Sequence, residues 1–192
     1  MIDGAHTLGQ IDIDIKNLEA DFYIANCHKW LYSPKGTALL WVNSKWHSII
    51  RPTVISSEGP YNDNEWYKNF DYIGSRDYTN FLSIKEALEF RKSLGDSNIK
   101  KYMHDIAWAG AKAVAAIWKT RILVDNEQLN PAMVTVELPC DFDKANQVMA
   151  VLQSKFDTVI VISVGSNIPI IRLSGQIYLE LEDFTTIGNT IS

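Results

Sequence analysis

The sequence contains few cysteines, no excess of basic residues and no long hydrophobic run. Its 192 residues include only Cys27 and Cys140, too few for the disulfide framework of a small secreted domain. Eighteen basic against 23 acidic residues give a net charge of −5. No run of five basic residues is present, which argues against a nucleic-acid partner. No basic, apolar leader and no apolar stretch of about 18 residues is present, so we expect a cytoplasmic protein without a membrane anchor.

The remaining composition is that of a globular protein. Hydrophobic residues make up 46% of the chain and charged residues 21%, which excludes a disordered or fibrous chain. The length permits one large or two small domains. The first six residues pass from apolar to polar, the pattern of a buried strand that delivers side chains to a site. Because nothing precedes this strand for it to pair with, we expect that further chain belongs before it.

The first half of the chain predicts short strands followed by a long irregular segment. Residues 21–26 and 36–42 are buried-strand patterns with turn-forming residues between them. Residues 11–15 alternate as a half-exposed strand would, although the residues after them could begin a helical turn. Residues 51–82 are rich in Pro, Gly, Ser, Asn, Asp and aromatics, and irregular segments of this length usually form functional or interface loops.

The second half predicts helices and a small α/β unit. Ser83 and Glu86 have capping-box spacing and predict a helix over 84–94 that Gly95 ends. Apolar residues at three- and four-residue steps predict a second helix over about 96–120, long enough to connect two domains. The later expected elements are a strand at 132–138, a helix at 143–155, strands at 158–164 and 169–174, and a helix at 182–191.

Three short motifs near the start carry the chemistry when they are taken together: Asp3-Gly4-Ala5-His6, Asn26-Cys27-His28-Lys29-Trp30 and Pro34-Lys35-Gly36. Each alone is common, since an Asp before Gly is most often a turn former. An acid at the end of one buried strand and a lysine at the end of another are what a pyridoxal phosphate (PLP) enzyme needs. The carboxylate pairs with the pyridine nitrogen, and the amine forms a Schiff base.

With two later motifs, 74–79 (GSRDYT) and 172–178 (RLSGQIY), the sequence resembles the class V aminotransferase family of fold-type-I PLP enzymes, most closely the isopenicillin N epimerase-like branch. The resemblance implies an α/β fold. Residues 1–95 would be the back portion of a large, mainly parallel PLP domain, and residues 96–192 a linking helix and a small C-terminal domain. It also implies a homodimer that acts at the α-carbon of an amino acid, by transamination, epimerisation or elimination.

The resemblance assigns a role to each motif residue. Lys29 would form the Schiff base with PLP and then move the α-proton. Asp3 would keep the pyridine nitrogen protonated, because a nearby opposite charge favours the charged form. His6 would donate to the phenolic oxygen of the cofactor. For His6, a purely structural histidine remains the alternative.

Four further residues complete the expected site. Asn26 and His28 would bind the phosphate or shape the loop around it. Ser75 stands where relatives have a threonine that reaches the partner subunit's phosphate, and serine keeps the hydroxyl donor. Arg172 would bind the α-carboxylate of the substrate through its planar guanidinium group. A surface arginine at a strand edge is the alternative for Arg172.

Other interpretations of the same residues stay open. Cys27 and His28 could be a nucleophile pair or metal ligands, but neighbours in a strand point to opposite faces and no second Cys or His has zinc-like spacing, so we expect no metal. Cys140 lacks the basic neighbours of an activated desulfurase thiolate. Because fold-type-I enzymes are usually about twice this long, the chain could also be an inactive fragment that serves only as an interaction module.

Overall fold

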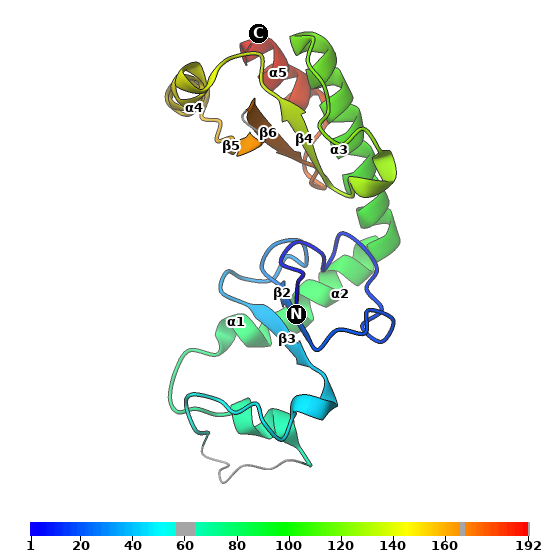
Figure 1. Cartoon of the computed structure of the whole chain (residues 1–192), viewed down its shortest axis with the longest axis vertical. Helices are drawn as coiled ribbons and strands as arrows, with labels where there is room; N and C mark the ends of the chain where they lie inside the picture. The colour runs from blue at the N-terminus through cyan, green and yellow to red at the C-terminus, as the bar shows by residue number, and fades with distance from the viewer. Residues whose placement is uncertain (57–63, 166–167, 192) are drawn as a thin grey trace. The chain divides into compact units, whose positions relative to one another are not determined.

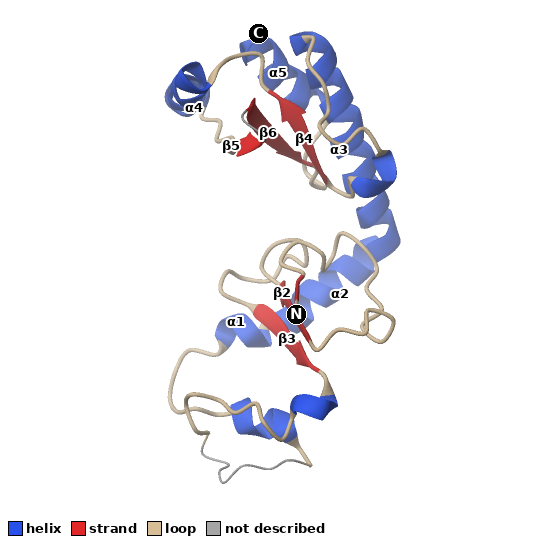
Figure 2. Cartoon of the chain, viewed as in Figure 1, coloured by secondary structure: helices blue, strands red, loops and turns tan. Residues whose placement is uncertain are grey.

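The computed structural model describes residues 1–56, 64–165 and 168–191. The chain divides into two compact units, Met1–Ser93 and Leu94–Ser192, and the boundary expected from the sequence lies two residues beyond this division. Each unit contains one three-stranded sheet with helices (Figures 1 and 2). The α/β architecture is therefore as the sequence predicted.

The sheet of the first unit places β2 between β1 and β3. β1 (Ile2–Asp3) runs parallel to β2 (Phe22–Asn26), and β3 (Ala38–Val42) pairs antiparallel with the other edge of β2. Within the described residues, one pairing is thus parallel and one antiparallel. Alternate residues of β2 are buried, which fixes which side chains face the core.

The alternating segment 11–15 is not a strand. Ile11 makes only an isolated bridge with Leu8, and the chain then turns at Asp14. The Asp14 carboxylate accepts hydrogen bonds from the backbone N–H groups of Lys16 and Asn17, at 3.0 and 3.2 Å. This side-chain turn competes successfully with strand pairing.

Helical turns and one longer helix complete the first unit: η1 (Ser44–Trp46), η2 (Trp66–Phe70), α1 (Thr79–Leu82) and α2 (Ile84–Leu94). The expected irregular segment 51–82 contains η2 and α1, and its residues 57–63 lie outside the described residues. α2 has the predicted bounds, but the predicted capping box is wrong. The Ser83 hydroxyl donates to the Thr79 carbonyl at 2.8 Å and so belongs to the end of α1.

The second unit begins with the long helix α3 (Asp96–Trp118) and ends with α5 (Leu181–Ile191). Between them come η3 (Glu127–Leu129), β4 (Met133–Glu137), α4 (Phe142–Phe156), β5 (Ile162–Gly165) and β6 (Ile168–Ser174). The sheet is antiparallel throughout, with β6 between β4 and β5. The sequence predicted each of these elements except η3, and β5 begins later than expected.

The core of the second unit lies between α3 and the sheet. Met103, Ala107 and Val114 of α3 are fully buried, as are Val134 of β4 and Ile171 of β6. Both α3 and α5 lie beside the sheet in Figure 1. Alternate residues of β6 therefore face this core, and Arg172 between them faces away and is exposed.

Gly175 follows β6 where the chain passes directly against α3. A β-carbon at this position would lie 2.2 Å from the backbone oxygen of Met103, a separation that real atoms do not adopt. The Gly175 N–H also donates to the Ala132 carbonyl at 2.8 Å. The glycine of the 172–178 motif is therefore required by the close packing between β6 and α3.

We expect Gly175→Ala to destabilise the second unit by about 1–3 kcal/mol, the usual cost of forcing extra volume into a packed core. Urea denaturation followed by circular dichroism measures this. Gly188→Ala in α5 is the matched control, because the one atom within 3.0 Å of its β-carbon would be the terminal Cδ1 of Ile117 and not backbone, and alanine favours a helix. Equal destabilisation by the two variants would contradict the close approach at Gly175.

Candidate active site

The candidate site lies where β1 and β2 end. Because the two strands are parallel, their carboxyl ends meet at the same edge of the sheet. Asp3 is the last residue of β1, and Lys29 follows the end of β2 by three residues. The N–H of Gly4 donates to the Ile24 carbonyl at 2.7 Å, which continues the pairing to the point where the chain turns.

The turn after Asp3 depends on a glycine. A β-carbon on Gly4 would lie 2.6 Å from the ring of Tyr23, a residue of β2 that is almost fully buried. The Tyr23 hydroxyl bonds to the Thr7 hydroxyl, which also donates to the Gly4 carbonyl at 2.8 Å. One oxygen of the exposed Asp3 carboxylate accepts the Ala5 N–H at 2.9 Å. These bonds form a tight turn that carries the chain to His6.

His6, Lys29 and Trp30 are in direct contact. The Nζ of Lys29 lies 3.1 Å from Nε2 of His6, and Nε1 of Trp30 donates to Nδ1 of His6, also at 3.1 Å. His6 and Lys29 are half-buried, whereas Trp30 is buried with 4% of its surface exposed. The structure thus brings two predicted site residues together and adds Trp30, to which the sequence assigned no separate role.

His28 takes part in the backbone structure of the loop after β2. Its Nδ1 donates to the Thr37 carbonyl at 2.8 Å, and the same carbonyl accepts the Cys27 N–H at 3.1 Å. The Thr37 side chain is fully buried and donates to the Pro34 carbonyl at 2.9 Å. Asn26 is half-buried at the end of β2. His28 therefore shapes the loop, and its role toward a phosphate stays a prediction.

Arg91 of α2 holds the two halves of the site together, and sequence reasoning missed it. Its side chain is 1% exposed, and its two terminal nitrogens donate to the carbonyls of Trp30 at 2.6 Å and Gly9 at 2.9 Å. The guanidinium also lies over the ring of Tyr32, with 5.0 Å to the centroid. The planar guanidinium group of Arg91 thus links the segment after His6 to the segment after Lys29.

Gly9 allows this close arrangement. Its φ of +86° lies in the left-handed region, and a β-carbon there would come within 2.5 Å of the Trp30 carbonyl oxygen. Only glycine meets both conditions without strain. A buried arginine within a helix carries no pattern that would identify these partners from the sequence.

The remaining predicted residues are not joined to this cluster by any contact described. Ser75 is exposed, and its hydroxyl lies 3.4 Å from that of Tyr72. Arg172 belongs to the second unit, where it lies opposite Thr135 of β4 and lines a pocket of about 510 Å³ together with Asp183 and Phe184. Their roles at the site stay predictions.

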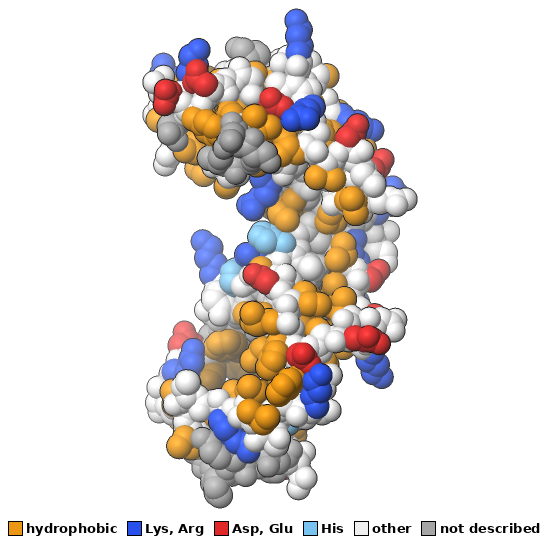
Figure 3. Space-filling model, viewed as in Figure 1, with side chains coloured by type: hydrophobic (Ala, Val, Ile, Leu, Met, Phe, Trp, Pro, Cys, Tyr) orange, Lys and Arg blue, Asp and Glu red, His pale blue; other side chains and the backbone are white. Residues whose placement is uncertain are grey.

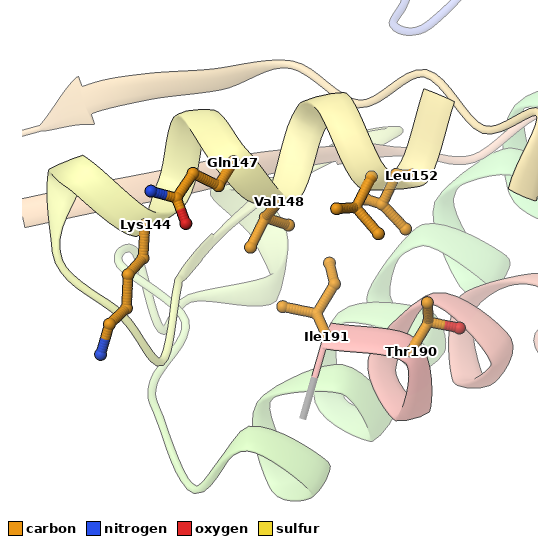
Figure 4. A pocket seen from close by; sticks show the side chains of 7 residues that line it. Lys144, Gln147, Val148, Leu152, Thr190 and Ile191 are labelled. Carbon is orange, nitrogen blue, oxygen red and sulfur yellow. The ribbon is translucent and has the colours of Figure 1, made fainter. Parts of the chain in front are cut away.

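A second pocket in the same unit lies between α4 and α5 and holds none of the predicted site residues (Figure 4). Its volume is about 290 Å³, and Val148, Leu152 and Ile191 give it a largely apolar lining with Lys144 at the rim. Within residues 1–56, 64–165 and 168–191, no three His, Cys, Asp or Glu side chains are grouped to hold a metal ion. In the same part of the chain, no helix has the length and apolar character needed to cross a bilayer.

Neither cysteine has the surroundings of an activated thiolate. Burial raises the pKa of the Cys27 thiol. Burial also raises the pKa of the Cys140 thiol, and the negative charge of Asp141 adds to this effect. A raised pKa lowers the thiolate fraction at neutral pH, which is the opposite of what a nucleophilic cysteine needs.

Comparison with known proteins decides the family. The family model described as aminotransferase class-V matches residues 1–175. The chain belongs to the class V aminotransferase family. The resemblance drawn from the motifs is therefore confirmed, and PLP is the cofactor on which this family's enzymes depend.

Individual relatives differ in their reactions. The chain is 31% identical to hercynylcysteine sulfoxide lyase of Schizosaccharomyces pombe, 28% identical to a probable chloroplastic L-cysteine desulfhydrase of Arabidopsis thaliana and 23% identical to isopenicillin N epimerase of Streptomyces clavuligerus. All of this chain is covered in each case, but only 50%, 43% and 51% of those relatives. The chain thus spans about half the length of the curated relatives it matches.

A solved structure shares the fold. The apo cysteine desulfurase of Thermococcus onnurineus NA1 superposes with a TM-score of 0.77 at 16% sequence identity. The match covers 97% of this chain and 50% of that one. At this identity the likeness supports the α/β fold of a class V enzyme and carries no argument about the reaction.

We expect Arg91→Met to loosen the site by leaving the buried Trp30 carbonyl and the part-buried Gly9 carbonyl without their charged donor, at a cost of about 1–3 kcal/mol for the buried one. Thermal unfolding of the purified protein and hydrogen exchange of the loops around Gly9 and Trp30 measure this. Lys92→Met is the matched control, since the neighbouring Lys92 is exposed. A melting temperature for Arg91→Met equal to that of Lys92→Met would show that the link is not stabilising.

Proposed function

We propose that this chain is part of a PLP-dependent enzyme that removes the α-proton of an amino acid, with Lys29 as the catalytic base. The observation that carries the proposal is the contact of His6 with Lys29 at the edge where Asp3 ends β1. A carboxylate, an imidazole and an amine at one edge match the three polar positions of the PLP ring: its nitrogen, its phenolic oxygen and its aldehyde.

When it is bound, PLP supplies an electron sink for the charge that remains at the α-carbon after the proton leaves. The residues of this chain do the rest. Asp3 would hold the proton on the ring nitrogen, because its negative charge favours the protonated form. His6 would orient and stabilise the phenolic oxygen. Lys29 would bind the cofactor covalently and then, once freed, accept the α-proton on Nζ.

The reaction that follows proton removal is proposed to be β-elimination from a sulfur-containing amino acid. The Schizosaccharomyces pombe and Arabidopsis thaliana relatives carry the names of a sulfoxide lyase and a cysteine desulfhydrase, and both are more similar to this chain than the isopenicillin N epimerase is. In β-elimination the α-proton goes to Lys29. The α–β double bond forms as the C–S bond breaks, and the sulfur leaves with the bonding electrons.

The motifs predicted an aminotransferase- or epimerase-like activity. β-Elimination is compatible with the same residues, because transamination, epimerisation and elimination all begin with removal of the α-proton. Persulfide formation as in a cysteine desulfurase is not proposed, because the raised pKa values of Cys27 and Cys140 disfavour a thiolate at either position. Arg172 would bind the substrate's carboxylate. The cytoplasmic location, and a homodimer in which Ser75 reaches the partner subunit's phosphate, complete the proposal.

The activity is proposed for the protein at the full length of its relatives, and not for this chain alone. Hydrophobic side chains are exposed on the first unit (Figure 3), among them Ile24, Leu39 and Leu40 of the sheet. Further protein would cover them in a longer enzyme. The phosphate of PLP also needs several charge-assisted hydrogen bonds, each contributing about 1.5–3 kcal/mol, and two or three missing donors lower affinity by about two to six powers of ten.

We expect borohydride reduction after incubation with PLP to leave a pyridoxyl group on Lys29 in the full-length protein, and little or none on this chain at low micromolar PLP. Mass spectrometry of peptides locates the group. Lys29→Arg should abolish the labelling, and Lys35→Arg, in the same loop, should leave it intact. Stoichiometric labelling of the isolated chain would show that it binds the cofactor by itself. No labelling at Lys29 of the full-length protein would favour the interaction-module alternative.

We expect Arg172→Ala in the full-length enzyme to raise the KM for the amino acid about 10- to 150-fold, the loss of one charge-assisted pair, while Lys29 remains labelled by PLP. Steady-state kinetics with cysteine and its S-substituted derivatives measure this. Arg121→Ala is the control, because Arg121 is an exposed arginine of the same unit that pairs with Glu137. An unchanged KM would indicate that Arg172 is a surface residue that does not bind the substrate.

A further inference from the structure

We propose that Trp30 is a positioning residue that holds His6 in the neutral tautomer with hydrogen on Nε2. The tautomer follows from contacts within this chain. Its consequence for the cofactor rests on the proposed function.

The direction of the first hydrogen bond is fixed by chemistry. The indole N–H of Trp30 is a donor only, so the Nδ1 of His6, 3.1 Å away, must accept with its lone pair. A neutral imidazole has one N–H, which is then on Nε2. The doubly protonated ring would direct its own Nδ1–H at the indole N–H, so the contact disfavours it.

The surroundings keep the indole in this position. Trp30 is 4% exposed, and its ring meets that of His6 edge-on, with centroids 6.5 Å apart. The Trp30 carbonyl accepts from Arg91 at 2.6 Å, and Gly9 packs against the same carbonyl. The Trp30 backbone is thus held by Arg91, and its buried ring lies against the ring of His6.

The tautomer sets the direction of the second hydrogen bond. The Nε2 of His6 lies 3.1 Å from the Nζ of Lys29. With hydrogen on Nε2, His6 donates and the Lys29 amine accepts through its lone pair, a bond that only the unprotonated amine can make. The opposite tautomer would instead accept a hydrogen bond from an ammonium group through its Nε2 lone pair.

The same tautomer suits the role expected of His6 toward PLP. With Nε2–H, His6 presents a hydrogen-bond donor on the side of Lys29, where a phenolic oxygen needs one. With the hydrogen on Nδ1 it would present a lone pair to that oxygen. Trp30 acts here only through His6, which makes it a positioning residue and not a catalytic one.

The test is histidine-selective ¹⁵N NMR of the purified protein without cofactor, since protonated and bare ring nitrogens have well-separated shifts. We expect a bare Nδ1 and a protonated Nε2 for His6. His28 provides an internal reference, because it directs Nδ1 at a backbone carbonyl and must have the opposite tautomer when neutral. A protonated Nδ1 on His6 in the unmodified protein overturns the proposal without any variant.

Trp30→Phe keeps an aromatic ring and removes the donor. We expect its His6 signals to change from one tautomer to an exchange-averaged mixture, and the rate of Lys29 labelling by PLP in the full-length protein to fall by a factor of roughly 2–10, the effect of one neutral hydrogen bond. The matched control is Trp46→Phe, which removes an indole donor to Asp21 at 2.9 Å and makes no described contact with His6. His6 signals that stay unchanged in Trp30→Phe would contradict the proposal.

The two proposals fail in different ways. If Lys29 is never labelled by PLP but His6 shows the Nε2–H tautomer only when Trp30 is present, the proposed function is wrong and the positioning contact stands. If Lys29 is labelled and His6 has hydrogen on Nδ1, the PLP proposal stands and the role of Trp30 is refuted.

Discussion

The arrangement of this site depends on the parallel pairing of β1 with β2. β1 is only two residues long, yet its register, Asp3 opposite Ile24, decides that the turn after Asp3 and the loop after Asn26 begin at the same edge of the sheet. A slip by one residue would send the Asp3 side chain to the other face. The hydrogen bonds around Gly4 and Tyr23 then turn the chain so that the His6 side chain contacts Lys29.

A strand of two residues cannot fix this geometry alone, and α2 supplies the second constraint. The buried guanidinium of Arg91 is bonded to carbonyls from both segments, so the loops carrying His6 and Lys29 are tied to one helix. Burying a charge is unfavourable unless its donors are satisfied, so the buried guanidinium requires the Trp30 and Gly9 carbonyls to be in place. Rigid placement of this kind is what a site needs to hold reacting groups in one geometry.

The family and most of the secondary structure could be predicted because their signals are local. Helix α3 shows its apolar face at every turn, and α2 begins and ends within residues that the pattern marks. Two local predictions were wrong for physical reasons that the pattern does not contain. The carboxylate of Asp14 turned an alternating segment away from a strand, and the hydroxyl of Ser83 ended one helix where a capping box was expected to start the next.

The sequence by itself determined the family and the α/β class, and it marked Asp3, His6 and Lys29 as candidate site residues, because motif order and side-chain periodicity are properties of the chain. Only the tertiary structure decided which atoms meet. Three contacts join residues that are far apart in the sequence: the hydrogen bond from Trp30 to His6, the hydrogen bond from Arg91 to Gly9, and the close approach of Gly175 to Met103. Such contacts arise from packing, which leaves no periodic trace in the order of the residues.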